Sequence, residues 1–376
     1  MDGYLTKAAA RSVLSSKVGA AARAYLGRPF SAKVDRRLLV YYHPNPISWA
    51  QIYPFAYYAD RIRAKYGTDI RFRPVEDFLS GRHIATGQSD VVLVQPWFDV
   101  ERRRLAHALE TLVERHRPAC VAFMDSFAHS DIRLMGTVDP YVDVYVKKSL
   151  FKDRSLYLRP FRGDTNLTEY YGDLYGIEAD AVDWQVPSAS LSKLRAGPNF
   201  HTAPIFLDHL SKSPALPDTE RGIDIQTRLG TKGSEWYSAM RSHAMKAVHA
   251  LEGTTQSPPG RLSRKAYMRE MKNSKLCFSP FGYGELCWRD IEAFVTGAVL
   301  VKPSMEHLDT LPDLYSPGVT YLPIRWDFAD LDETVHRALA DPDLRSSLSR
   351  AGHDRLLHYV RTEQFVNDIA FLFEAP

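Results

Sequence analysis

The chain has 376 residues, which is too long for one compact core of ordinary size and fits two α/β domains. Hydrophobic residues make up 45% and charged residues 25%, as in a globular protein rather than a disordered one. The formal net charge is only +3, so the composition gives no reason to expect nucleic acid or another polyanion as a partner. The three cysteines form no CxxC pair, which argues against a disulfide framework or a zinc site and for a reducing, cytoplasmic compartment.

Residues 1–36 form a basic segment at the start of the chain. Lys7, Arg11, Lys17 and Arg23 stand among alanine, serine and a few apolar residues, and acidic residues are nearly absent. We expect a helix here, which either packs on the protein or contacts anionic lipid at the inner face of a membrane. The weak apolar stripe favours packing. No apolar run approaches the roughly 20 residues of a transmembrane helix, so none is expected.

From residue 37 onward, short apolar runs alternate with amphipathic helical segments. Strands separated by helices imply a parallel sheet that helices cover on both faces. Proline, glycine and serine concentrate between residues 195 and 220, so we place the boundary between two such domains at 210/211. The expected strands are 38–42, 70–73, 91–94, 120–124, 142–146, 223–227, 276–279 and 298–301. The expected helices are 47–65, 99–116, 233–251, 263–274, 286–296, 330–340 and 344–373.

The densest chemical signal lies between the expected strand 276–279 and the expected helix 286–296. A glycine-containing loop there lets backbone N–H groups approach a phosphate, and the helix N-terminus adds a favourable dipole. Arg289 can pair with a phosphate, and Glu292, on the same helix face, can accept ribose hydroxyls. Alternatively, Glu285 caps the helix and Arg289 pairs with Glu292 at the surface. The candidate binding residues of this block are Ser279, Gly282, Tyr283, Gly284, Glu285, Arg289 and Glu292.

Residues 275–303 resemble the donor-binding region of GT-B glycosyltransferases, especially of the exostosin-like and family-1-like groups. In the enzymes that this block resembles, the arginine contacts the donor pyrophosphate and the second glutamate binds the ribose, which implies these roles for Arg289 and Glu292. Many retaining GT-B enzymes have seven residues between two glutamates, whereas six separate Glu285 from Glu292, which weakens the case for retention. The resemblance is carried by Ser279-Pro280-Phe281-Gly282, Gly284-Glu285, Arg289, Glu292-Ala293, Gly297 and Val299–Val301.

The resemblance implies an α/β chain with the GT-B fold, in which two Rossmann-like domains face a central cleft. Residues 37–210 would form the acceptor domain, and residues 211–354 the nucleotide-sugar donor domain. The last segment, 355–376, would be a helix that crosses back to the first domain, as is common in folds of this type.

A second phosphate-binding candidate is the turn at residues 227–233. It resembles the Arg…Lys-Gly turn of many GT-B donor domains, and Arg228 and Lys232 there could neutralise a leaving diphosphate. An ordinary solvated turn is the equal alternative. With arginine and lysine in this role we expect no metal ion and no cofactor. The Asp-x-Asp sequence at 341–343 falls in a polar turn between helices.

The catalytic base is sought in the first domain. His43 follows the first expected strand and Asp125 the fourth, so both should lie at the same edge of a parallel sheet. Some inverting GT-B enzymes place a base histidine and an orienting aspartate at these points, which implies a His43–Asp125 dyad that deprotonates the acceptor hydroxyl. The alternatives are a simple turn at His43 with Asp125 as a helix cap, Asp125 alone as the base, and then His129.

Aromatic residues are abundant near the same sheet edge. They could stack on sugar faces or on a hydrophobic acceptor, although most such residues belong to the core. Trp326 and Asp327, after an expected donor-domain strand, are further candidates for contact with the donor sugar or base. The aromatic set is Trp49, Tyr53, Tyr57, Tyr58, Trp97 and Phe98.

Together these features predict a glycosyltransferase that moves a sugar from a nucleotide-sugar donor to a hydroxyl of a glycan or lipid-linked acceptor, in an inverting, metal-independent reaction. We expect a cytoplasmic protein of polysaccharide biosynthesis, in peripheral contact with a membrane if the basic segment binds lipid. Two other functions stay open. One is a GT-B-like epimerase or phosphorylase, and the other is a non-catalytic scaffold that binds a nucleotide or a glycan.

Overall fold

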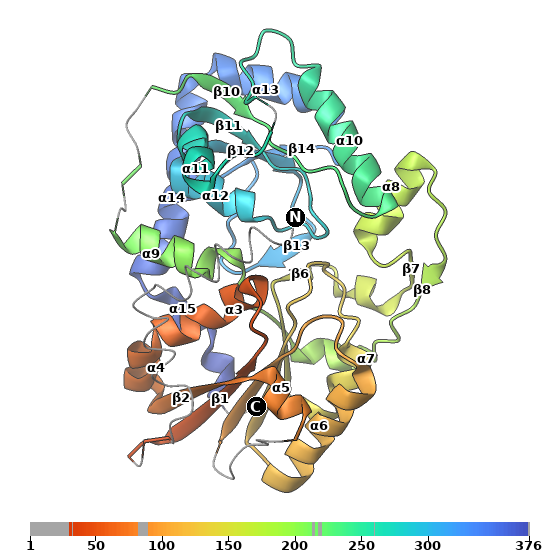
Figure 1. The fold of residues 1–376 in the computed structure, drawn as a ribbon, viewed down its shortest axis with the longest axis vertical. Helices are drawn as coiled ribbons and strands as arrows, with labels where there is room; N and C mark the ends of the chain where they lie inside the picture. Colours follow the sequence, from red (N-terminus) through yellow and green to blue (C-terminus); the bar gives the residue numbers. More distant parts are fainter. Residues whose placement is uncertain are drawn as a thin grey trace.

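The computed structural model describes residues 30–31, 33–81, 89–212, 215–216, 220–258 and 260–374. The helix expected in residues 1–36 lies outside the described residues, apart from its last positions. Within the described ranges, no helix is both long and apolar enough to cross a membrane. The chain folds into two α/β units, one above the other in Figure 1, and each unit has its own parallel sheet.

The first unit contains a six-stranded parallel sheet. Its strands, in spatial order, are β2 (Thr68–Pro74), β1 (Arg36–Tyr42), β3 (Val91–Gln95), β4 (Cys120–Met124), β5 (Val144–Lys147) and β9 (Leu194–Ala196). Strands β3 and β5 are buried at every position, which their continuous apolar sequences predict for a sheet covered on both faces. The helices are α3 (Pro46–Tyr57), α4 (Ala59–Tyr66), α5 (Val75–Leu79), α6 (Arg102–His116), α7 (Met135–Val138) and α8 (Asn166–Tyr175).

The expected helix 47–65 is two helices in the structure. Tyr58, between α3 and α4, departs from helical geometry with φ −101° and ψ 20°. Its hydroxyl donates to the carbonyl of Val360, near the end of the chain, so a tertiary contact accompanies the break. Short elements complete this unit: β6 (Ser149–Phe151), β7 (Phe161–Arg162), β8 (Ala181–Val182), and the 3₁₀ turns η1 (Asp139–Tyr141), η2 (Arg154–Leu158), η3 (Ser188–Lys193) and η4 (Phe200–Thr202).

The second unit contains a four-stranded parallel sheet. Its strands, in spatial order, are β10 (Ile223–Gln226), β11 (Ser274–Phe278), β12 (Val299–Pro303) and β14 (Leu322–Ile324). A further strand, β13 (Leu308–Thr310), pairs antiparallel with β6 and so links the two units. The helices are α9 (Pro204–Lys212), α10 (Glu235–His249), α11 (Arg264–Lys272), α12 (Trp288–Thr296), α13 (Leu331–Ala340), α14 (Pro342–Arg361) and α15 (Gln364–Asp368), followed by η5 (Ala370–Leu372).

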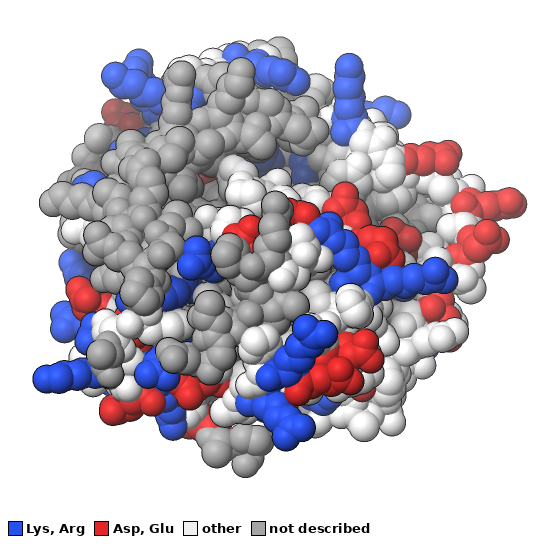
Figure 2. Space-filling model, turned by 60° about the horizontal axis from the view of Figure 1, so that its bottom comes forward, with Lys and Arg blue, Asp and Glu red and all other residues white. Residues whose placement is uncertain are grey.

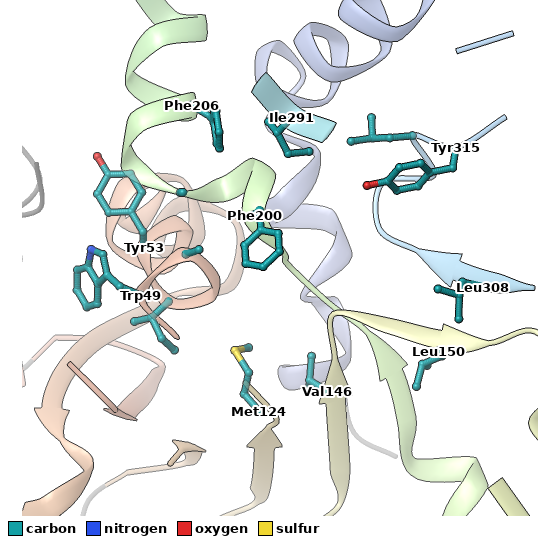
Figure 3. Packing of buried hydrophobic residues seen from close by; sticks show 14 of the residues in the cluster. Trp49, Tyr53, Met124, Val146, Leu150, Phe200, Phe206, Ile291, Leu308 and Tyr315 are labelled. Carbon is teal, nitrogen blue, oxygen red and sulfur yellow. The ribbon is translucent and has the colours of Figure 1, made fainter. Parts of the chain in front are cut away.

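The connection between the two sheets packs against both units. Phe200, in η4, stacks on Trp288 at the start of α12, with ring centroids 4.9 Å apart. Figure 3 shows the Phe200 ring between the strand ends of the first sheet and Ile291 of α12. Thr202 donates from Oγ1 to the carbonyl of Ala50 at 2.7 Å. These contacts fix the connection, so it acts as a packed joint rather than as a free linker.

The end of the chain lies against the first unit. Phe365 packs edge-to-face on Phe55 of α3 at 5.0 Å, and Phe373 stacks on Tyr66 of α4 at 4.5 Å. The single helix expected over 344–373 is divided, because Glu363 between α14 and α15 has a positive φ of 53°. The division lets the last residues turn onto α3 and α4.

The surface at the bottom of the view in Figure 1 carries mixed charge. Figure 2 shows lysine and arginine side chains next to aspartate and glutamate side chains on this face, in keeping with the net charge of +3. Across the coloured residues of that view, the two signs are interspersed. A segregated positive field would be needed to attract a polyanion to this face.

Candidate active site

The glycine-containing loop at 279–285 leaves the carboxyl end of β11, where ligands of open α/β sheets bind. Its first residue is held by a buried polar cluster. Ser279 donates from Oγ to Asp290 Oδ1 at 2.6 Å, and Asp290 Oδ2 accepts from the Tyr315 hydroxyl at 2.9 Å. Lys302 Nζ lies 3.2 Å from the same Asp290 oxygen, with both side chains fully buried. The charge of Lys302 is thereby neutralised, and Ser279 serves to fix where the loop starts.

The two glycines of this loop have different surroundings. A Cβ on Gly284 would lie 1.8 Å from the carbonyl oxygen of Ala128, in the loop after β4 of the first unit. A Cβ on Gly282 would meet nothing closer than 3.5 Å. Glycine is therefore required at Gly284 because the two units touch there, whereas a Cβ at Gly282 would make only ordinary van der Waals contacts.

Glu285 joins the two units. Its carboxylate is fully buried and accepts from Ser130 Oγ at 2.9 Å and Asn166 Nδ2 at 3.0 Å, both in the first unit. His307 Nε2 lies 3.3 Å from the same carboxylate in the second unit. Burial raises the pKa of Glu285, but the hydrogen bonds from His307 and Asn166 outweigh it and lower the pKa to about 2. The structure thus places this predicted donor-binding residue in an interdomain contact.

Two arginines converge on the loop without an acidic partner. Arg289 donates from Nη1 to the carbonyl of Phe278 at 3.3 Å, and from Nη2 to the carbonyl of Arg228. Arg241 of α10 is buried, and its Nη2 lies 3.9 Å from the Cβ position of Gly282. The Nε atoms of both arginines are buried without a hydrogen-bond partner, and neither guanidinium forms an ion pair with any residue that the structure describes.

The electrostatic surroundings of Arg241 are unfavourable to its charge when the site holds no anion. Burial lowers the pKa of Arg241, and the nearby charge of Arg289 lowers it further. Arg241 was missed by the sequence analysis, although a signal exists. It shares one face of α10 with Tyr237, Ala244 and Val248, all buried, so an arginine stands in an otherwise apolar stripe.

The other predicted donor-site cations are arranged differently. Arg228 makes two hydrogen bonds of 2.6 Å to the carboxylate of Glu270 and donates to the carbonyl of Gly260, so its charge is already paired. Lys232 is exposed on the turn after β10. Glu292 is buried and accepts from Arg264 Nη1 at 3.2 Å and from the Tyr267 hydroxyl at 2.9 Å.

Tyr283 is the exposed residue of the loop. Its ring is 42% exposed and stacks on Tyr237 at 4.6 Å, and its hydroxyl accepts from the backbone N–H of Ser234. Of the two further donor candidates, Trp326 donates from Nε1 to the carbonyl of Ser304, and Asp327 pairs with a neighbouring exposed arginine. The tyrosine therefore offers a ring face beside the arginine pair.

The predicted dyad of the first unit is not held together by a hydrogen bond in the described structure. Asp125 Oδ2 accepts from the Tyr145 hydroxyl at 2.7 Å and from Lys147 Nζ at 2.9 Å, and Oδ1 accepts from the N–H of Phe127. His43 stacks instead on Trp97 at 5.3 Å, and its Nδ1 is buried without a partner. Asp125 therefore neutralises a buried lysine and does not orient His43.

His129 is the histidine next to the loop. Its ring is parallel to that of Tyr283, with centroids 6.2 Å apart, and its Nδ1 is buried without a hydrogen-bond partner. Asp131 lies 4.0 Å from that nitrogen, but Arg133 holds the Asp131 carboxylate through two hydrogen bonds. Burial lowers the pKa of His129 to about 4, so the imidazole is neutral near pH 7. Across the described residues, no group of three or more histidine, cysteine or acidic side chains is arranged to hold a metal ion.

The sequence matches no protein-family model and no curated protein. The structure is similar to solved glycosyltransferases. A glycosyltransferase from Rickettsia africae ESF-5 aligns over 90% of this chain and 97% of its own, at 6% identity and a TM-score of 0.50. An alpha-glucosyltransferase solved with UDP and a 13-mer DNA aligns over 89% and 99%, at 9% identity and a TM-score of 0.48. The sucrose-phosphate synthase of Thermosynechococcus elongatus aligns over 90% and 98%, at 12% identity and a TM-score of 0.46.

The protein has the GT-B fold of glycosyltransferases, with two Rossmann-like units that meet at the glycine-containing loop. This confirms the fold that the resemblance of residues 275–303 implied. At such low identity the likeness speaks for the fold, and the chemistry must be argued from this chain's own residues.

Proposed function

We propose that the protein is a glycosyltransferase that moves a sugar from a nucleotide-sugar donor to a hydroxyl of a glycan or lipid-linked acceptor. The observation that carries the proposal is the pair Arg241 and Arg289 at the glycine-containing loop. The buried cation Arg241 and the half-buried cation Arg289, both without acidic partners, are costly in a folded protein unless an anion joins them. The diphosphate of a nucleotide sugar supplies the required charge and accepts several N–H donors.

The proposed reaction is a single displacement with inversion. The acceptor oxygen attacks the anomeric carbon while the bond from that carbon to the diphosphate oxygen breaks. The acceptor proton passes to a base, and His129 is the candidate that its neutral state and its place beside Tyr283 favour. The electron pair of the broken bond stays on the diphosphate, whose charge Arg241 and Arg289 stabilise without a metal ion.

The proposal also includes a ribose ligand and a place in the cell. Glu292 is the candidate ribose ligand by its place on α12, where it would exchange one of its present partners for the ribose hydroxyls. A peripheral membrane contact on the cytoplasmic side, and a role in polysaccharide biosynthesis, rest on the sequence of residues 1–36 and on the chemistry of the reaction.

The test is a thermal-shift screen of the full chain against UDP, GDP, CMP, dTDP and ADP. A nucleotide that binds the native state raises the melting temperature by mass action. We expect one nucleotide to do so in the native protein, and expect Arg289→Ala and Glu292→Ala to lose most of that shift. Arg350→Ala, on the exposed side of α14, is the matched control and should keep it. No shift from any of the five at millimolar concentration would contradict the donor site.

A further inference from the structure

A continuous row of rings runs along the first unit towards the glycine-containing loop. His43 stacks on Trp97 at 5.3 Å, and Trp97 contacts Phe98 at 5.0 Å. Phe98 contacts Phe127 at 4.7 Å, and Phe127 stacks on His129 at 4.6 Å. These residues follow β1, β3 and β4 at their carboxyl ends, so the parallel sheet brings them to one edge.

The row continues into the second unit. The His129 ring is parallel to Tyr283, with centroids 6.2 Å apart, and Tyr283 stacks on Tyr237 at 4.6 Å. The guanidinium of Arg241 lies over the Tyr237 ring at 5.1 Å. We call the set His43, Trp97, Phe98, Phe127, His129 and Tyr283 the aromatic row. Its second-unit end therefore reaches the cations that we assign to the donor diphosphate.

The row is held firmly, and two of its rings, Phe98 and Tyr283, are exposed to solvent. Arg133 lies over Phe127 at 4.1 Å and over Trp184 at 4.4 Å, and its two hydrogen bonds to Asp131 fix its position. Phe98 is 37% exposed and Tyr283 is 42% exposed. Large aromatic rings that are partly exposed to water, and whose neighbouring side chains are held in place, offer contact area for a ligand.

The row also carries polar atoms that lack partners. Nδ1 of His43 and Nδ1 of His129 are both buried without a hydrogen bond. Both imidazoles are neutral near pH 7, because burial lowers the pKa of each. A neutral imidazole can donate and accept a hydrogen bond, but a hydroxyl group pairs with either Nδ1 only after the side chains that cover it move. An acyl chain on the row would leave both nitrogens unpaired.

We propose that the aromatic row is the acceptor subsite and that its occupant is an oligosaccharide; the inference rests on the proposed glycosyl transfer. Sugar rings offer apolar C–H faces for Phe98 and Tyr283, and hydroxyls for the two imidazoles. A single-stranded nucleic acid would also stack on the rings, but it needs cations along its phosphates. Arg133 is already paired with Asp131, and Asp99 is exposed beside Phe98, so the charge along the row favours a neutral chain.

The experiment measures binding of the full chain to an array of neutral and acidic oligosaccharides, with poly(dT) and vesicles of phosphatidylcholine and phosphatidylglycerol as competing probes. We expect the native protein to bind a neutral oligosaccharide in preference to the acidic ones and to both other probes. Phe98→Ala, which removes an exposed ring, should weaken that binding at least 10-fold, and Phe98→Trp should restore it. Val319→Ala, another exposed apolar residue, is the control and should change nothing.

The outcomes separate this inference from the donor site. Oligosaccharide binding that Phe98→Ala leaves intact would overturn the aromatic row as the acceptor subsite, and so would preferred binding of poly(dT) or vesicles. A nucleotide thermal shift without any oligosaccharide binding would overturn the row alone and leave the donor site standing. Oligosaccharide binding that depends on Phe98, without any nucleotide shift, would support the row and contradict the donor site.

Discussion

The loop after β4 in the first unit and the loop after β11 in the second unit both bury charged groups, but they treat them differently. In the first unit, the ammonium of Lys147 lies 2.9 Å from the carboxylate of Asp125. In the second, Arg241 and Arg289 face the glycine-containing loop without an acidic partner among the described residues. The charges are thus completely paired in one loop, whereas the other loop has an excess of cation.

The difference indicates which charges hold the fold and which await a ligand. A buried ion pair whose hydrogen bonds are complete has nothing left to offer a substrate. A buried cation without a partner keeps the cost of desolvation until an anion arrives. Asp125 looked catalytic in the sequence because it follows a strand, yet its contacts are those of a structural residue. Arg241 drew no notice there, yet its surroundings are those of a binding residue.

The largest expected effect comes from a substitution that breaks the buried ion pair of the first unit. Asp125→Ala leaves Lys147 buried and unpaired, so we expect the free energy of unfolding to fall by about 3–5 kcal/mol in chemical denaturation. The double variant Asp125→Leu/Lys147→Met removes both charges and should recover most of the loss. If Asp125→Ala kept its stability and lost only transferase activity, Asp125 would be the base and our interpretation would be wrong.

Substitutions of the two glycines in the second loop test which of them is needed for the contact between the units. Gly284→Ala drives a Cβ against the Ala128 carbonyl across the interface, so we expect a loss of about 3 kcal/mol and a larger radius of gyration in X-ray scattering. Gly282→Ala meets only ordinary contacts and should stay within about 0.5 kcal/mol of the native protein. The reverse ranking of the two variants would refute the interdomain role of Gly284.

A smaller effect concerns a buried neutral group, His201 in η4. Burial lowers its pKa to about 3, whereas an unfolded histidine titrates near pH 6.5. The unfolded chain therefore binds a proton first as the pH falls, and this histidine makes the protein less stable between pH 6.5 and about 3. We expect His201→Gln to reduce the stability lost from pH 7 to pH 5 by about 1–2 kcal/mol. Urea unfolding at both pH values measures it, and an unchanged pH dependence would contradict the assignment.

The sequence predicted the α/β pattern, because apolar runs and helical periodicity are local. The expected strand 120–124 is β4 residue for residue, and the expected helix 286–296 differs from α12 by two residues at its start. It also predicted which loop to inspect, since glycines between a strand and a helix mark a ligand-binding edge. The break at Tyr58 could not be read locally, because it accompanies a contact with Val360, about three hundred residues away.

The partners of charged residues were the part that the sequence could not supply. Glu285 carries a donor-site motif, but its partners Ser130 and Asn166 come from the other unit. Arg228, on the turn after β10, is paired with Glu270 of α11, and the distance between these residues in the sequence does not suggest this contact. Whether a buried charge is free depends on such distant neighbours, and this decides its role.

The most direct test of the claim that Arg241 is a cation awaiting an anion is the variant Arg241→Met. Its thermal stability and its affinity for a nucleotide are both measured. The nucleotide is the one of UDP, GDP, CMP, dTDP and ADP that stabilises the native protein most. Removing a buried charge without a partner should raise the melting temperature of the nucleotide-free protein by about 2–4 °C. The same change should weaken nucleotide binding about 10–100-fold in titration calorimetry, because charge-assisted hydrogen bonds are lost. A variant that is less stable and binds the nucleotide as tightly as the native protein would show that Arg241 is structural and would contradict the account.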